Sequence, residues 1–173
     1  IPAELQVAAN NAKIPILGTQ LTSSQILSNM TSYLLGRLAP RQSLHGVLVD
    51  INGVGVLITG DSGVGKSETA LELVRRGHRL VADDRVEVYA RDEQTLVGKA
   101  PAILKHLMEI RGIGIIDVST LYGTGAIMPS DVINLIVHLE TWTPDVQFDR
   151  LGDRGDKQTI QGVIVPKVSV PVK

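Results

Sequence analysis

Residues 60–67 read Gly60-Asp61-Ser62-Gly63-Val64-Gly65-Lys66-Ser67 and decide the fold of the chain. They match the Walker A pattern, in which glycines let the backbone curl so that successive N–H groups point at phosphate oxygens. In such a loop Lys66 reaches the outer phosphates and the Ser67 hydroxyl binds Mg2+. The alternative is a glycine-rich turn before an ordinary helix. An apolar strand before the loop and a helix after it favour a site for the phosphates of a nucleotide or pyrophosphate.

Two predicted strands lead into this loop. Residues 46–51 and 54–59 are apolar runs joined by Asn52-Gly53, the dipeptide that best suits a type I′ turn. After the loop, apolar residues recur with helical spacing over 66–76, and Gly77 follows where a C-cap glycine belongs. Further strands are expected at 80–82, 86–89, 95–97, 113–118 and 132–139, the last two buried, and a short helix should open at Pro101. The fold class is therefore α/β: a P-loop-type core with a mixed sheet, whose antiparallel hairpin leads into the Walker A loop, flanked by helices.

The two ends of the chain differ from this core. Residues 1–40 hold a helical pattern of apolar residues that ends before Pro40, and we interpret them as the remnant of an N-terminal domain or linker. Residues 41–173 then form the domain that carries the P-loop. The chain begins without Met and ends inside a strand-like alternation at 168–172, so we expect a fragment truncated at the C-terminus. Residues 149–158 are rich in charge and glycine and should form a mobile loop.

Composition excludes several classes of partner. The 173 residues are 43% hydrophobic, which suits one compact domain with a core. Seventeen basic and eighteen acidic residues give a net charge of −1, so nothing favours nucleic acid or an anionic membrane. A single Trp and a single Phe offer no platform for stacking bases, and no apolar run approaches the roughly 20 residues of a membrane span. With no cysteine, a reducing compartment is compatible, and we expect a cytoplasmic protein.

Asp83 and Asp84 follow the predicted strand 80–82 and are candidates for the carboxylates of a Mg2+-phosphate site. Adjacent residues at a strand end point to opposite sides, so one could hold the metal while the other acts as a general base. The alternative is a solvated turn between two strands. Sixteen residues lie between Lys66 and Asp83, fewer than in most P-loop ATPases. The chain also lacks the Asn-Lys-x-Asp, His-Arg-Asp and Asp-Phe-Gly motifs, which excludes GTPases and eukaryotic-type protein kinases.

Several stretches of the sequence together match a known family: 44–50 (Leu-His-Gly-Val-Leu-Val-Asp), 60–73 and 76–84, with 109–117 and 149–152 in addition. In these stretches the chain closely resembles bacterial HPr kinase/phosphorylase. It implies transfer of phosphate from ATP or pyrophosphate to a serine of HPr, the carrier protein of the sugar phosphotransferase system, in the regulation of carbon metabolism. It also implies the reverse reaction, in which inorganic phosphate removes the serine phosphate and leaves as pyrophosphate. The family implies a magnesium cofactor, with Mn2+ as an alternative, and a homo-oligomer, the hexamer.

The resemblance also assigns roles to individual residues. It implies that residues 60–67 hold the phosphates, with Lys66 catalytic, and that Ser67 and Glu109 bind the metal with support from Asp83. It implies that Asp84 exchanges the serine proton. His45 and Arg150, the latter on the predicted loop, match catalytic residues of the family. Taken alone, His45 would be an ordinary strand-edge residue, Arg150 a surface charge and 109–112 a solvated face, so their roles depend on the resemblance.

The sequence is compatible with three classes of function. The first is a serine kinase and phosphorylase acting on HPr, which the resemblance favours. The second is a small-molecule kinase on a similar core; phosphoenolpyruvate carboxykinase has a related P-loop scheme, but it is larger and carries additional metal-ligand motifs. The third is a regulator that binds nucleotide without catalysis. Asp84 separates an enzyme from a sensor, because only an enzyme needs a group that exchanges the serine proton.

Overall fold

The computed structural model describes residues 1–142 and 155–172, and its contacts divide the chain into two units. The first, Ile1–Leu35, holds helix α1 (Ala3–Ala12) and most of helix α2 (Ser23–Leu38). Neither helix has a buried residue. The second unit, Gly36–Lys173, contains the P-loop, so the site is built from this unit alone.

The predicted hairpin and the helix after the loop are both confirmed. Strands β2 (Val47–Ile51) and β3 (Val54–Gly60) pair antiparallel, with Asn52 at φ 54° and Gly53 at φ 86°, the signs that a type I′ turn requires. Helix α3 (Lys66–Arg75) ends one residue earlier than expected. Gly77, at φ 95°, then donates to the Val74 carbonyl and completes a Schellman motif together with the bond from His78 N–H to the Leu73 carbonyl.

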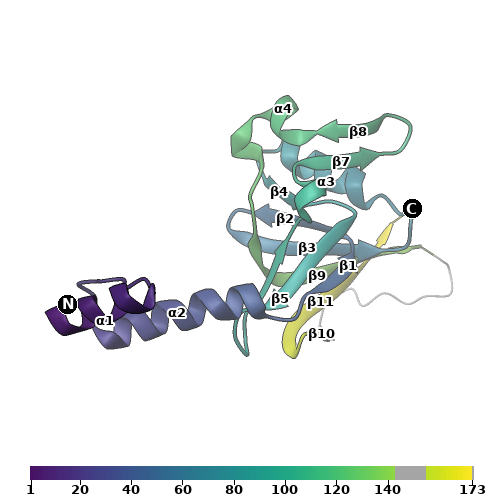
Figure 1. Ribbon diagram of the computed structural model, residues 1–173. Helices are drawn as coiled ribbons and strands as arrows, with labels where there is room; N and C mark the ends of the chain where they lie inside the picture. Colours follow the sequence, from purple (N-terminus) through teal and green to yellow (C-terminus); the bar gives the residue numbers. More distant parts are fainter. Residues whose placement is uncertain (143–154, 173) are drawn as a thin grey trace. The chain divides into compact units, whose positions relative to one another are not determined.

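The sheet is mixed, as predicted. Strands β2 and β3 are extended on one side by β4 (Arg79–Ala82) and on the other by β9 (Asp131–Thr141). The order continues from β9 through β6 (Leu96–Lys99) and β5 (Arg85–Ala90) to β1 (Gln42–His45), and the hairpin of β10 (Asp156–Ile160) and β11 (Val163–Val172) joins β9 separately. Among the described strands, β3 and β11 run parallel to β9 and the other pairings are antiparallel (Figure 1).

A small second sheet lies over the P-loop helix. It consists of β7 (Leu107–Ile110) and β8 (Gly114–Asp117), which Figure 1 shows above α3. Short helices flank this sheet in the chain: η1 (Ala102–Leu104) before it, and α4 (Val118–Tyr122) and η2 (Thr124–Ala126) after it. Pro101 caps η1, as the sequence predicted.

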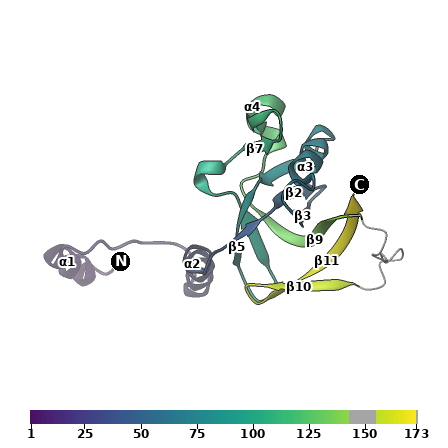
Figure 2. The same cartoon turned by 90° about the vertical axis from the view of Figure 1, so that its right-hand side faces the viewer.

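Successive side chains of the central strands point to opposite faces of the sheet, and an apolar core lies on each face. Val47 and Val49 of β2 contact the core under α3 and β7, whereas Leu48 between them lies in the core on the opposite face. Residues of β5, β6, β10 and β11 close that opposite core, so strands rather than helices cover it. Figure 2 shows α3 and α4 on one side of the sheet and the β10–β11 hairpin on the other.

Two expectations from the sequence were wrong in part. Residues 113–118 do not form a buried strand, because β8 covers only Gly114–Asp117 and leaves Ile115 71% exposed. In the predicted mobile loop 149–158, residues 149–154 lie outside the described residues, but Asp156–Gln158 form strand β10, paired with β11. Charged residues can form a strand because the hydrogen bonds between strands join backbone groups. The side chains of Asp156–Gln158 remain exposed to solvent.

A buried polar cluster lies where β2, β3, β4 and β9 meet. Asp50 is 3% exposed, and Arg79 Nε donates a hydrogen bond to its Oδ1 at 3.1 Å, while Arg79 Nη2 forms an ion pair with the same oxygen at 3.1 Å. Asp50 faces Gly55 across the β2–β3 hairpin, and a Cβ at Gly55 would lie 2.9 Å from Oδ2 of Asp131. That Oδ2 is buried without a hydrogen-bond partner. Burial raises the pKa of the Asp131 carboxyl, and the neighbouring Asp50 carboxylate raises this pKa further.

The raised pKa predicts an unusual dependence of stability on pH. The pKa of the Asp131 carboxyl is higher in the folded protein than in the unfolded chain. The contribution of Asp131 to the free energy of unfolding is therefore fully present below the pKa of the unfolded chain, and it is lost as the pH rises through the pKa of the folded protein. Asn cannot ionise, so Asp131→Asn should become more stable relative to the wild type as the pH rises from about 3 to about 7 in urea unfolding.

Asp92→Asn provides the matched control, because hydrogen bonds from Thr95 and Gln94 lower the pKa of the exposed Asp92 carboxyl. This variant should instead lose stability relative to the wild type over the same pH range. A relative loss in Asp131→Asn would contradict the arrangement of the buried cluster.

Candidate functional site

The P-loop curls between β3 and α3 because its glycines allow two conformations that other residues avoid. Gly60 has φ 141°, and a Cβ there would lie 2.4 Å from the Leu139 carbonyl of β9. Gly65, at φ 99°, is the N-cap of α3. The Lys66 side chain, 7% exposed, folds back along the loop, and its Nζ donates to the carbonyls of Gly60 (3.0 Å) and Asp61 (2.9 Å). The ammonium is therefore held beside the loop, where it can meet a phosphate.

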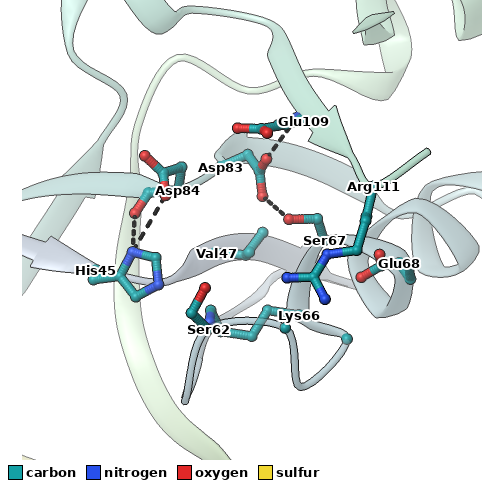
Figure 3. A pocket seen from close by; sticks show the side chains of 12 residues that line it. His45, Val47, Ser62, Lys66, Ser67, Glu68, Asp83, Asp84, Glu109 and Arg111 are labelled. Atoms are coloured by element: carbon teal, nitrogen blue, oxygen red, sulfur yellow. Dashed lines mark hydrogen bonds and ion pairs between the residues drawn. The ribbon is translucent and has the colours of Figure 1, made fainter. Parts of the chain in front are cut away.

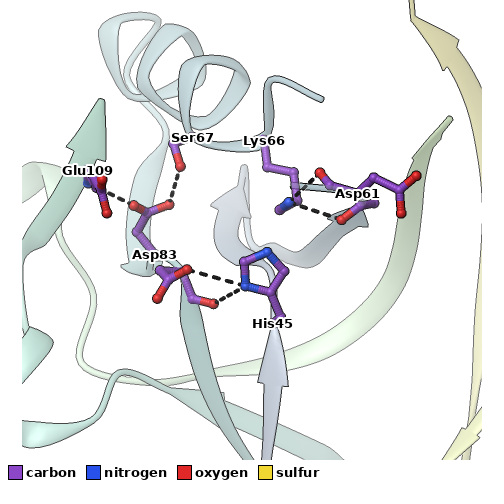
Figure 4. A network of polar contacts seen from close by, with 8 residues as sticks. His45, Asp61, Lys66, Ser67, Asp83 and Glu109 are labelled. Atoms are coloured by element: carbon purple, nitrogen blue, oxygen red, sulfur yellow. Dashed lines mark hydrogen bonds and ion pairs between the residues drawn. The ribbon is translucent and has the colours of Figure 1, made fainter. Parts of the chain in front are cut away.

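Asp83 connects three separate elements. It follows β4 and is 3% exposed. Its Oδ1 accepts a hydrogen bond from the Ser67 hydroxyl of α3 at 2.8 Å, and its Oδ2 accepts from the Glu109 N–H of β7 at 2.9 Å (Figure 4). Burial raises the pKa of the Asp83 carboxyl, and these two hydrogen bonds act against that rise. A cation bound at this point would favour the ionised carboxylate.

Asp84 occupies the corner between β4 and β5 and has φ 62°, a left-handed conformation that a single Asp tolerates. His45 Nδ1 lies 3.2 Å from Oδ1 of Asp84 and 3.1 Å from its carbonyl oxygen. Since both of these atoms are acceptors, we assign the proton to Nδ1. The other ring nitrogen then faces the side of the P-loop on which Ser62 lies (Figure 3).

One pocket brings most of the predicted site residues together. Ser62, Gly63, Gly65, Lys66 and Ser67 line it from the P-loop, and His45, Asp83, Asp84 and Glu109 line it from the other elements. Figure 3 shows Ser62 and Lys66 on one side of the pocket, Glu109 on the other, and the two aspartates between them. The two aspartates were expected to point to different sides of the strand end, and their contacts do differ. Asp83 contacts Ser67, and Asp84 contacts His45.

Four predicted site residues do not line this pocket. Gly60 and Asp61 contribute their carbonyls to Lys66, and Val64 packs against the core under α3. Arg150 lies outside the described residues, so its predicted role is left as a prediction.

Arg111 also lines the pocket. The resemblance assigned the segment 109–112 to metal binding and catalysis, but it gave Arg111 no role of its own. A Cβ at Gly63 would lie 2.8 Å from its guanidinium, so the arginine reaches over the P-loop. Arg111 forms no hydrogen bond or ion pair with the residues that the structure describes. The sequence did offer one sign of this position. Arg111 lies two residues after Glu109, and alternate residues of an extended segment point to the same face. Glu68, in the first turn of α3, lines the pocket as well.

The residues present fit a divalent cation bound together with phosphates. Among the described residues there is no group of three or more His, Cys, Asp or Glu side chains that could hold a metal ion alone. Mg2+, however, is commonly held by one or two carboxylates with waters and substrate phosphates completing its shell. The Ser67 hydroxyl and the Asp83 carboxylate are hard oxygen donors already in contact, and the Glu109 side chain lines the same pocket.

No helix in the described part of the chain has the length and apolar character needed to cross a membrane.

Comparison with known proteins identifies the family of the chain. Residues 36–173 match the model of the HPr Serine kinase C-terminal domain family. The chain is 91% identical over 173 residues to an HPr kinase/phosphorylase of Limosilactobacillus reuteri, covering 100% of this chain and 54% of the relative. It is 69% identical over 172 residues to an HPr kinase/phosphorylase of Levilactobacillus brevis, covering 99% of this chain and 55% of the relative.

A solved structure of the Hpr(Ser) kinase/phosphatase from Coxiella burnetii has the same fold. It superposes with a TM-score of 0.70 at 36% sequence identity, covering 76% of this chain and 86% of that one. The chain spans about half the length of the curated relatives it matches. The family match covers all of the second structural unit, including every residue of the pocket. The chain belongs to the HPr Serine kinase C-terminal domain family.

Proposed function

We propose that the protein transfers phosphate from ATP or pyrophosphate to a serine of HPr, and that it also catalyses the reverse phosphorolysis by inorganic phosphate. The observation that carries this proposal is the position of Asp84, whose side chain lies in the same pocket as the P-loop and contacts His45 at 3.2 Å. A protein that only bound nucleotide would need the loop but no proton acceptor beside it. The names of the relatives support the same reaction.

On the donor side, the P-loop and two positively charged side chains would hold the phosphates. The N–H groups at the start of α3 supply a positive helix end, and Lys66 and Arg111 add charge from either side of the loop. Arg111 suits this role because its guanidinium has no partner among the described residues. Ser67, Asp83 and Glu109 would hold Mg2+ or Mn2+, which when bound neutralises charge on the phosphate oxygens.

On the acceptor side, Asp84 would exchange the proton of the serine hydroxyl. Going forward, its carboxylate takes the proton as the serine oxygen attacks phosphorus and the bond to the leaving phosphate breaks. In reverse, inorganic phosphate attacks the phosphorus of the phosphoserine, the bond from phosphorus to the serine oxygen breaks, and the protonated carboxyl returns the proton to that oxygen; pyrophosphate is the product. The N–H at His45 Nδ1 restrains the Asp84 carboxylate, and the other ring nitrogen of His45 faces the side of the P-loop on which Ser62 lies.

The lining of the pocket supports the use of pyrophosphate as a donor. No Phe, Tyr or Trp is among the described residues that line it. A site without an aromatic surface for the base gains its affinity chiefly from phosphate contacts. Such a site can accept pyrophosphate in place of ATP, because the two share the phosphates that the loop contacts.

Asp84→Asn is the direct test of the proposed proton exchange. We expect phosphorylation of HPr by Mg2+-pyrophosphate to fall by roughly 10²- to 10⁴-fold, the usual contribution of a positioned general base. Pyrophosphate affinity, measured by calorimetry, should change by less than about threefold, since Asp84 contacts no P-loop residue through a described hydrogen bond.

Asp92→Asn is the matched control, because the side chains of Asp84 and Asp92 are 59% and 54% exposed. It should transfer phosphate at the wild-type rate. A near-normal rate in Asp84→Asn would show that another group exchanges the proton, whereas no phosphoserine with either donor in the wild type would refute the proposed function.

Arg111→Ala tests the arginine that reaches over the loop. Loss of a charge-assisted hydrogen bond should weaken the binding of Mg2+-pyrophosphate by roughly 10- to 100-fold. The exposed Arg91, which pairs only loosely with Asp92 at 3.8 Å, gives the control Arg91→Ala with an unchanged dissociation constant. Equal affinities for the Arg111→Ala protein and the wild type would place Arg111 outside the phosphate site.

A further inference from the structure

A second, apolar pocket opens beside the phosphate pocket. Its apolar side chains are those of Leu104 of η1, Leu107 of β7 and Ile115 of β8, and the buried Met108 of β7 also borders it. Asp83, Asp84 and Glu109 line both pockets, so the two share a wall of three acidic residues. A group bound in the apolar pocket would therefore lie directly beside the proposed base Asp84.

The register of the β7–β8 sheet explains why an apolar side chain lies beside an acidic residue of the shared lining. Glu109 of β7 pairs directly with Ile115 of β8, so their side chains stand side by side on the same face. Met108 and Ile110 point the other way into the core and are 1% and 5% exposed. Ile115 is 71% exposed, although a two-stranded sheet could have carried a polar residue there.

The phosphate donor does not fit this second pocket. The P-loop, Lys66 and Arg111 lie in the first pocket and none of them lines the second. Among the described residues that line the second pocket there is no Lys or Arg to offset the three shared carboxylates, whereas Lys66 and Arg111 do so in the first. In phosphoryl transfer the attacking and leaving oxygens stand roughly in line, so the acceptor must approach from the side opposite the P-loop. Figure 3 shows Glu109 on the side of the aspartates away from Ser62 and Lys66, and Glu109 also lines the apolar pocket.

We infer that this apolar pocket docks the phosphoacceptor protein, by receiving an apolar side chain next to the target serine while the serine hydroxyl meets Asp84. The inference rests on the proposed function, because it assumes transfer to a protein serine. Ile115 is the anchor of the docking surface, since it is the most exposed of the apolar residues that line the pocket. It contributes to acceptor affinity and takes no part in the chemistry.

Ile115→Asn tests the docking surface in steady-state kinetics with purified HPr and Mg2+-pyrophosphate. Loss of the buried isoleucine contact should raise the KM for HPr by about tenfold. The kcat at saturating HPr and the dissociation constant for pyrophosphate should stay within about twofold of the wild type, which a general structural defect would not allow. Ile115→Leu should restore most of the affinity for HPr.

Ile164→Asn is the matched control, because Ile164 is also an isoleucine on a strand and is 63% exposed, but does not line the pocket. Its KM for HPr should equal that of the wild type. An unchanged KM in Ile115→Asn, or an equal rise in both variants, would overturn this inference while the wild type still phosphorylates HPr. A change of oligomeric size in Ile115→Asn with an unchanged KM would assign the surface to a second copy of the chain and would also overturn it. No transfer to HPr by the wild type would instead refute the proposed function.

Discussion

The buried carboxylate of Asp83 is the interaction on which the site depends. One oxygen accepts a hydrogen bond from the Ser67 hydroxyl at the start of α3, and the other accepts from the Glu109 N–H of β7. These two bonds fix the P-loop helix and the small sheet against the end of β4. They also place the two candidate metal-binding side chains, Ser67 and Glu109, on either side of one carboxylate. Burial raises the pKa of the Asp83 carboxyl, a cost that a bound cation would offset.

The turn after β4 places two neighbouring aspartates in contact with different parts of the site. Because Asp84 adopts a left-handed conformation, the chain reverses within two residues, and Asp84 contacts His45 while Asp83 contacts Ser67. The phosphate-binding loop lines one of two pockets and the apolar residues around Ile115 line the other, and both pockets include this pair of aspartates. In the proposed reaction, the donor and the acceptor would reach the same carboxylates through different pockets, which suits in-line transfer.

Much of the core could be predicted from sequence because local patterns determined it. Asn52-Gly53 specified the hairpin, Gly77 ended α3, and the Walker A spacing located the loop. Strand β8 was predicted, but as a buried strand, and the charged strand β10 was missed, since backbone pairing and not burial maintains both. Arg111 was missed as an individual site residue because its position over Gly63 arises from the approach of two distant segments. The roles of His45 and Glu109 depended on a family resemblance, and no local pattern distinguished them from surface residues.

The most direct test of the account is phosphorolysis with labelled inorganic phosphate. Phosphoseryl-HPr is incubated with the protein, Mg2+ and [32P]phosphate, and the labelled products are separated. If a phosphate held by the P-loop attacks the serine phosphate while Asp84 returns the proton, each phosphoserine lost should yield one labelled pyrophosphate. Release of unlabelled inorganic phosphate without pyrophosphate would mean that water is the nucleophile, and it would contradict the account.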